Sequence, residues 1–388
     1  MPPSSRPADA RVTELLAKAG PAGLAPEDLV RELGDLSRST VNRRLAELVR
    51  SGAARVAGAG RFTRYVSASP LSRAEIDAYF AIPARQRPVA VFKEALLDVE
   101  PNIGLDKALR CAAIQAIATP VDKRFLTTFL VDFSWGSSVL EGSTYSALDT
   151  EALIQYGHRN KDKPTADAVL VLDHKTAVEY MWKHRELTVD NVCALHALVT
   201  HDHGLAEVAD SDHFLPEHQR GKPREYEEVN LGSSAYLPPF RPGTGFAART
   251  LGDIVERARA LHPVQAALYL MTRIPYVQVF ANGNKRTSRL AANTALLAGG
   301  LLPFSFADVD KADYIRGMAT FHELGDTLVM EQTFIEGYVR SVVRGSDVPV
   351  RMRTHGFDVE AVARELAAFV HTGKKPEDER ARMFVRGR

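Results

Sequence analysis

Cysteine is scarce in this sequence, which has only Cys111 and Cys193 among its 388 residues. Two cysteines give neither a disulfide framework nor the spacing of a zinc site, and their apolar, helix-like surroundings predict buried thiols. The sequence also lacks a signal peptide and any apolar run long enough to span a bilayer. We therefore expect a cytoplasmic protein that makes no membrane contact.

Net charge is also nearly absent. Lys and Arg total 49 against 48 Asp and Glu, a formal charge of +1, so the chain as a whole does not indicate a polyanionic partner. Any nucleic-acid or phosphate site must come from a local concentration of charge. The length favours two or three domains, and the composition, 45% hydrophobic and 25% charged, is that of a globular chain.

One such concentration lies in residues 278–289, QVFANGNKRTSR, between two apolar, helix-like stretches. An Asn-Gly-Asn turn that opens a helix exposes backbone N–H groups at the positive end of the helix dipole, where anions bind. Three cations follow within the first turns, which predicts a polyphosphate site. A helix that merely has a basic first turn is the alternative. The predicted nucleotide-binding residues are Asn282, Gly283, Asn284, Lys285, Arg286 and Arg289.

This segment resembles the core motif of the Fic/Doc family, which reads HxF, two residues, then GNGRxxR, with NKR in Doc-like members. The resemblance implies a mainly α fold, in which an all-helical core carries a β-hairpin flap. It also implies ATP or a related nucleotide, with Mg²⁺, as cofactor. In the family the histidine takes a proton from a Ser, Thr or Tyr hydroxyl of a protein target, which then receives AMP; Doc-like members transfer a phosphate.

Two positions depart from that motif. Gln278 stands at the position of the catalytic histidine, and its amide can orient a hydroxyl but cannot remove its proton. Loss of a general base typically removes about 10²–10⁴ in rate. Asn282 replaces the family's acidic residue and leaves one neutral oxygen as a weak Mg²⁺ ligand. The residues of the motif that would bind the nucleotide are present, while the residues that would act as base and as Mg²⁺ ligand are replaced.

A second motif lies upstream, in an inhibitory helix expected near residues 133–145. Ser137 and Glu141, followed by Gly142, match the family's inhibitory pattern [ST]xxxE[GN]. The resemblance implies that Glu141 pairs with Arg289 and so occupies the place of a γ-phosphate. A solvated glutamate on a helix is the alternative.

A third feature, within residues 221–239, resembles the family's flap, which holds a target segment by strand addition. Alternation from Tyr226 through Val229 to Leu231 predicts one strand, and a second follows the turn at Gly232. Nearby, the sequence has His201, His203, His213 and His218 in a polar stretch. They lack zinc spacing, so we do not expect a metal site there, and we expect His196 to be a packed helical residue.

Residues 10–68 resemble a winged helix-turn-helix domain. The pattern predicts three amphipathic helices, the second at residues 26–33 and the third capped by Ser37, followed by two short strands. Residues 36–68 contain seven arginines and one acid. This patch predicts binding to a duplex DNA operator by a homodimer, since one winged helix covers a short half-site. A winged helix used for protein contact is the alternative. The predicted DNA-binding residues are Ser37, Arg38, Thr40, Asn42, Arg43, Arg61 and Arg64.

The predicted domains are a winged helix (1–68), a connector (69–115), a Fic-like domain (116–345) and a C-terminal helix with a charged tail (346–388). Two functions compete. The first is a nucleotide-binding, Fic-like regulator of transcription whose AMP transfer is weakened or lost. The second is an active protein adenylyltransferase, or a related phosphotransferase or deAMPylase, that is inhibited by Glu141 and takes its base from another group.

Overall fold

The computed structural model describes residues 7–50, 53–57, 60–67, 71–208, 210–348 and 356–385. It forms two compact units that do not follow the chain in one piece. The first contains Met1–Lys93, Asn230–Pro239 and Ala319–Val329, and the second contains Glu94–Val229, Phe240–Met318 and Met330–Arg388. Helices dominate, with two small two-stranded sheets in the described part, which confirms the mainly α fold class.

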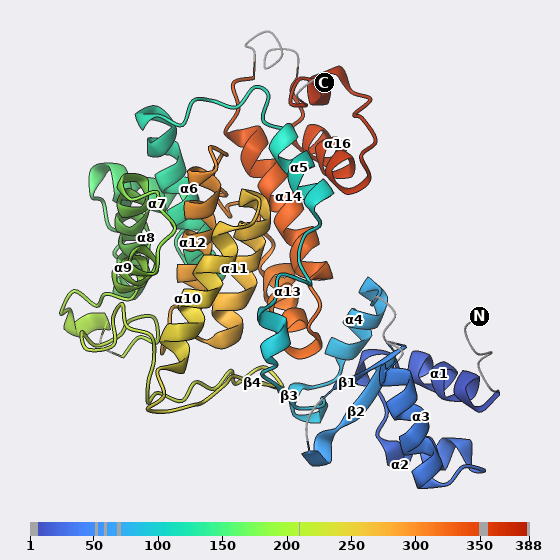
Figure 1. Cartoon of the computed structure of the whole chain (residues 1–388). Helices are drawn as coiled ribbons and strands as arrows, with labels where there is room; N and C mark the ends of the chain where they lie inside the picture. Colours follow the sequence, from blue (N-terminus) through green and yellow to red (C-terminus); the bar gives the residue numbers. More distant parts are fainter. Residues whose placement is uncertain are drawn as a thin grey trace. The chain divides into compact units, whose positions relative to one another are not determined.

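The first unit begins with a three-helix cluster and a hairpin (Figure 1). The elements are α1 (Pro7–Ala19), α2 (Pro26–Leu33), α3 (Arg38–Arg50), β1 (Ala54–Ala57) and β2 (Arg64–Ser67). β1 and β2 are antiparallel, with Ala54 opposite Ser67. The buried side chains Val12, Leu29 and Leu45 form a separate core, so the helices pack around their own apolar faces. The helices and strands expected in residues 10–68 are therefore present.

Local signals explain where these helices begin and end. Pro26 fits the first turn of α2, where its missing N–H costs nothing, and Gly34 ends the helix with φ 66°. Ser37 Oγ accepts the N–H of Thr40 at 3.3 Å, which caps α3. The connection between α2 and α3 is consequently short, as in helix-turn-helix motifs.

The rest of the first unit is assembled around the buried carboxylate of Glu323. Arg87 lies 2.9 Å from it, and Ser234 Oγ and the Tyr79 hydroxyl donate to it at 2.8 and 3.1 Å. Tyr79 belongs to α4 (Arg73–Ala81). β3 (Ala90–Val91) pairs in parallel with β4 (Tyr236–Leu237). One buried acid thus joins three stretches that are distant in the sequence.

The predicted β-hairpin flap is wrong. β4 exists, but Tyr226–Leu231 contains no strand, so Tyr226, Val229 and Leu231 present no strand edge to a target. Side chains form hydrogen bonds with the backbone groups that would otherwise pair with a second strand. The Glu227 carboxylate accepts the N–H groups of Glu225 and Tyr226, and Arg224 donates to the carbonyl of Glu227. Only the turn is retained, with the N–H of Ser234 bonded to Leu231 O.

The second unit is a helical assembly around α11 (Figure 1). Its other helices are α5 (Leu105–Ala113), α6 (Lys123–Glu141), α7 (Ala147–Tyr156), α8 (Thr165–Lys183), α9 (Val189–Val199), α10 (Phe246–Arg259), α12 (Asn284–Ala298), α16 (Val359–Thr372) and α17 (Glu379–Arg382), together with most of α13 (Lys311–Leu324) and α14 (Leu328–Arg344). α11 (Pro263–Val277) is buried at every position from Ala266 to Val277. A helix that is buried on all sides fixes the position of the loop that follows it. No helix in the described ranges has the length and apolarity needed to cross a membrane.

Candidate nucleotide-binding site

The loop between α11 and α12 turns on Gly283. This residue is the N-cap of α12 with φ 71°, a conformation that L side chains rarely adopt. A Cβ at this position would lie 2.6 Å from Thr200 Cγ2. Glycine is therefore required both by the backbone and by the close approach of the segment that follows α9.

Asn284 closes this loop on itself. Its Oδ1 accepts the N–H of Phe280 at 2.9 Å, and its Nδ2 donates to Phe280 O at 2.8 Å and to Gln278 Oε1 at 2.9 Å. These bonds satisfy the polar groups of a buried turn, as burial requires. Asn284 therefore holds the loop in shape and has no amide group left for a ligand.

Gln278 is equally occupied. It adopts φ 50° and is buried; its Nε2 donates to Pro275 O at 2.7 Å while its Oε1 accepts from Asn284. Its carbonyl oxygen accepts from Arg224 Nε at 2.5 Å. The residue at the family's catalytic position thus has both ends of its amide committed to the fold. An amide in this state neither removes a proton nor points a free group at a substrate.

His196 of α9 supports the same loop. Its Nδ1 accepts the N–H of Gly221 at 2.9 Å, so its Nε2 donates to Asn282 O at 3.0 Å, and its ring stacks on Phe280 with centroids 3.8 Å apart. Burial lowers the pKa of His196 to about 3, which keeps the ring neutral. The expectation of a packed histidine is confirmed, and the structure adds that this histidine positions the loop.

Glu141 and Arg289 form the ion pair that the inhibitory motif predicts. Glu141 Oε1 lies 2.7 Å from Arg289 Nη2, and the Arg289 side chain has 0% exposed surface. The other two guanidinium nitrogens also donate, Nε to Ser137 Oγ at 2.9 Å and Nη1 to the Tyr314 hydroxyl at 3.2 Å. Arg289 is therefore closed to any ligand while Glu141 is in place.

The local electrostatics favour this closed state. Glu141 is the last residue of α6, where a negative charge opposes the helix dipole, and its burial raises the carboxyl pKa. The nearby cations Arg289, Lys285 and Arg286 outweigh that cost and hold the Glu141 pKa well below its usual range. A single carboxylate thus stands where these cations converge, and such a place would also suit a phosphate.

A buried hydrogen-bond chain fixes Arg289 from behind. Its Nε donates to Ser137 Oγ, which lies 2.8 Å from His174 Nε2, and His174 Nδ1 lies 2.7 Å from Leu170 O. Because the carbonyl can only accept, Nδ1 carries the proton and Nε2 accepts from Ser137. Burial lowers the pKa of His174 to about 3, so the chain keeps one direction over the physiological pH range.

Arg286 and Asn282 lie under the loop of residues 210–215. Arg286 donates to Val199 O and, at 2.7 Å, to His213 O, while the Asn282 amide nitrogen donates to Asp212 O. The Arg286 Nε is buried without a hydrogen-bond partner. A phosphate oxygen would satisfy this unpartnered donor, which is consistent with an anion site that is covered in this state. Lys285 lies 3.7 Å from Glu141 and stays half exposed.

The residues present do not fit a magnesium ion. Asn282 is the position that would hold it, but its Oδ1 accepts the N–H of Gly283 at 2.5 Å and its amide nitrogen is bonded to Asp212 O. Mg²⁺ is usually held through carboxylates and phosphates, whereas the one side-chain oxygen of Asn282 is neutral and already used by Gly283. Within the described ranges, no group of three or more His, Cys, Asp or Glu could hold a metal ion.

The histidine-rich stretch forms an anchor for the covering loop. His203 Nε2 lies 2.6 Å from Asp173 Oδ1, and Arg220 Nη2 lies 2.5 Å from Asp202 Oδ1. Asp173 is buried and its Oδ2 has no hydrogen-bond partner, so burial raises its pKa to about 7. The first contact ties His203 to α8, and the second joins the two ends of the segment that contains the covering loop of residues 210–215.

The residues predicted to bind DNA are less available than their charge suggests. Arg38 lies 2.5 Å from Glu27, and Arg64 lies 3.8 Å from Asp28. Both acids belong to α2, outside the segment whose charge was counted. Ser37, Asn42 and Arg43 are exposed and Thr40 is half-buried, whereas the side chain of Arg61 lies outside the described residues. The exposed start of α3 is thus polar but carries one unpaired arginine among its described residues, Arg43.

Two site residues were not found from the sequence. Tyr314 of α13 belongs to no part of the motifs above, yet its hydroxyl accepts from Arg289. His174 lies within an ordinary amphipathic helix, and only the fold brings it to Ser137. The Ser137–His174 pair can be recognised only when the packing of α6 against α8 is known.

Residues 186–296 match the family model described as Fic/DOC family. The chain therefore carries a Fic/DOC-family domain, and the match includes the loop, α11 and nearly all of α12.

Two curated relatives are similar to this chain. The protein adenylyltransferase Fic of Nematostella vectensis is 24% identical over 262 residues, which cover 65% of this chain and 56% of that protein. The protein adenylyltransferase fic-1 of Caenorhabditis briggsae is 22% identical and covers 55% of this chain and 39% of that protein. The matches thus span about half the length of these relatives. A solved Fic family protein from Desulfovibrio desulfuricans is 18% identical, with a TM-score of 0.49, covering 72% of this chain and 83% of that one.

Proposed function

We propose that this protein is a nucleotide-binding Fic/DOC-family regulator whose AMP-transfer chemistry is weakened or lost. The observation that carries this proposal is the state of Gln278, whose amide is used at both ends by Pro275 and Asn284. No base replaces it within that loop, because the neighbouring polar side chains are also committed. The cations of α12, in contrast, are retained and face a removable carboxylate.

Nucleotide binding requires that Glu141 leave Arg289. A triphosphate would then meet Lys285, Arg289 and the N–H groups of the first turn of α12, which favour anions. The covering loop must also release Arg286 from His213 O. ATP or a related nucleotide is the ligand class that this arrangement suits, and the proposal needs no magnesium ligand from the protein.

In this proposal the regulatory output is DNA binding by residues 7–67, which are called the N-terminal unit below. A short helix-turn-helix connection, an exposed polar start of α3 and the β1–β2 hairpin support duplex DNA as its partner. Arg43 would contact phosphate or a base edge, and a homodimer would supply two half-sites. Nucleotide binding would act as the effector, so ATP should change the affinity for DNA, and Arg286→Ala should abolish that coupling.

Transfer activity separates the two functions. The purified protein is incubated with labelled ATP and a lysate of its own cells, beside Gln278→His, Glu141→Gly and the double variant Glu141→Gly/Gln278→His. The proposal predicts no label transfer by the wild type or by Glu141→Gly alone, and a gain only where histidine is restored. Label transferred to proteins by Glu141→Gly at a rate unaffected by position 278 would overturn it.

An active adenylyltransferase remains the second candidate. The buried pair of Glu141 and Arg289 favours this candidate, because an inhibitory contact is useful only in a protein that has an activity to inhibit. The two curated relatives are named protein adenylyltransferases, which supports a protein hydroxyl as the acceptor. Under this alternative, label transfer by Glu141→Gly would depend on a base outside the loop.

A further inference from the structure

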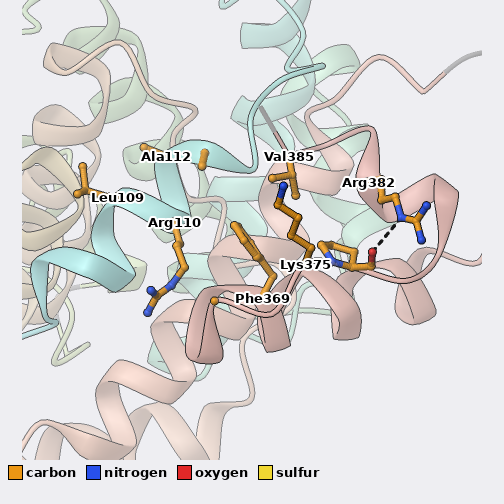
Figure 2. Close-up of a pocket in the computed structure, with 10 residues that line it drawn as sticks. Leu109, Arg110, Ala112, Phe369, Lys375, Arg382 and Val385 are labelled. Carbon is orange, nitrogen blue, oxygen red and sulfur yellow. Dashed lines mark hydrogen bonds between the residues drawn. The ribbon is translucent and has the colours of Figure 1, made fainter. Parts of the chain in front are cut away.

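A half-open cavity of about 700 Å³ lies in the second unit, away from the nucleotide-binding loop (Figure 2). α5 and α16 form its sides, and the segment that contains α17 closes it. Ligand-binding pockets commonly measure about 300–1,000 Å³, so the space suits a small molecule. The lining residues are Leu109, Arg110, Ala112, Ala113, Phe369, Gly373, Lys375, Pro376, Arg382 and Val385.

The walls of this cavity are mainly apolar. Leu109, Ala112 and Ala113 line it from α5, while Ala108 and Cys111 of the same helix are buried in the core. Leu109 is 50% exposed and presents apolar surface to the cavity. Phe369, which is 7% exposed, provides the facing wall from α16. An apolar chain laid between these helices would cover Leu109.

Positive charge surrounds this apolar space, and the lining contains no acidic residue. Arg382 is used by the fold, since it donates to Pro376 O at 3.0 Å and to Glu377 O at 2.7 Å. Arg110 donates through Nε to Val370 O at 2.7 Å, which leaves its terminal nitrogens free. Among the described residues Lys375 has no hydrogen-bond or ion-pair partner, unlike Lys374, which lies 2.6 Å from Glu377.

We propose that this cavity binds an amphipathic anion: an unbranched apolar chain with a carboxylate or phosphate head. The chain lies between Leu109 and Phe369, and the head pairs with Lys375. In the view of Figure 2 the Phe369 ring lies between Arg110 and the side chain of Lys375, and all three residues line the cavity. A ligand that carries a positive charge would find no acidic residue in the lining and would be repelled by Lys375 and Arg110.

Binding is measured by calorimetry on the full-length protein with hexanoate, octanoate and decanoate, all below their micelle concentrations. Each added CH₂ group should lower Kd about fourfold until the cavity is filled. Comparison of decanol with decanoate measures how much the charge contributes to binding. Comparison of decyl phosphate with decanoate shows which anionic head the cavity prefers. Equal Kd values along the chain-length series, or no saturable binding, would overturn the proposal.

Matched variants locate the site. Lys375→Ala should weaken decanoate binding about threefold to fivefold and leave decanol unchanged, as expected for a solvent-exposed ion pair. Lys374→Ala removes the same charge one residue away, outside the lining, and should have no effect. Ala112→Phe fills the cavity and should abolish binding, whereas Leu105→Phe on the same helix should not. Unchanged binding in folded Ala112→Phe, confirmed by circular dichroism, would contradict the assignment.

Discussion

Glu141 Oε1 lies 2.7 Å from Arg289 Nη2, and this contact joins the C-terminal end of α6 to the second turn of α12. The guanidinium is fully buried and makes further hydrogen bonds to Ser137 and Tyr314. A buried pair of this kind owes its stability to complete satisfaction of both partners, since desolvation of each charge is costly. Two properties follow: the pair should be sensitive to removal of one partner, and it should compete with any anion that binds Arg289.

Removal of the cation alone should be severely destabilising. Arg289→Met leaves Glu141 buried, with Lys285 at 3.7 Å as its nearest remaining ion-pair partner. The expected loss is about 3–5 kcal/mol in the free energy of unfolding, measured by urea denaturation. Lys374→Ala, which removes an exposed partner of Glu377, serves as control and should leave stability nearly unchanged. A loss for Arg289→Met no larger than that of the control would show that the pair is not buried in solution.

Gly283 should tolerate no side chain. Gly283→Ala combines φ 71° with a Cβ placed 2.6 Å from Thr200 Cγ2. Gly300→Ala is the matched control, because its φ is 70° and its Cβ would meet nothing within 4 Å. The control should lose about 1 kcal/mol from backbone strain alone, and Gly283→Ala should lose clearly more in the same urea titration. Equal losses would mean that Thr200 does not press on the turn.

Acid should destabilise the second unit through its two buried neutral histidines. His174 and His196 have folded pKa values of about 3, far below the ordinary value of about 6.5. Between these values the unfolded chain binds protons that the folded chain does not, so stability is complete above pH 6.5 and falls as pH drops toward 3. Each histidine should contribute a slope of about 1.4 kcal/mol per pH unit in that window.

His196→Gln removes one of these titrating groups and should flatten the dependence of unfolding free energy on pH between 6.5 and 3. Thermal unfolding at a series of pH values measures the slope. His218→Gln, at an exposed position outside the hydrogen-bond network of the loop, is the control. An unchanged slope in His196→Gln would indicate that its ring is protonated in the folded protein.

DNA binding by residues 7–67 should depend on salt through Arg43. Among the arginines whose side chains are described, Arg38 and Arg64 already face acids of α2. Arg43→Ala should reduce the slope of log K against log salt by about 0.9, because one phosphate fewer is neutralised. Arg31→Ala, at a residue of α2 that pairs with Asp28, should leave the slope unchanged. Genomic fragments that show no salt-sensitive enrichment at moderate ionic strength would leave the N-terminal unit as a protein-docking module.

Local sequence signals predicted much of this fold because they act over a few residues. Pro26 and Gly34 mark the ends of α2, and Ser37 marks the start of α3. The spacing from Ser137 to Glu141 places both side chains on one face of α6, and both reach Arg289. These features depend on helix geometry, which the sequence reports directly.

What the sequence could not predict depends on tertiary contacts. The alternation between Tyr226 and Leu231 is typical of a strand, but Arg224 is bonded to the carbonyl oxygens of Gln278 and Val277 and holds that segment in an irregular form. Likewise, His174 meets Ser137 only because α6 and α8 pack together. Tertiary hydrogen bonds of this kind override local strand propensity.

The most direct test of the account is the affinity for ATP, measured by calorimetry on the wild type and on Glu141→Gly. Release of Arg289 should tighten ATP binding about tenfold or more, equivalent to about 1.4 kcal/mol or more. Glu141→Gln, which keeps the size of the side chain but removes its charge, should lie between them. Arg286→Ala in the Glu141→Gly background should abolish the gain. Equal ATP affinity in the wild type and Glu141→Gly, both folded by circular dichroism, would contradict the claim that Glu141 closes a nucleotide site.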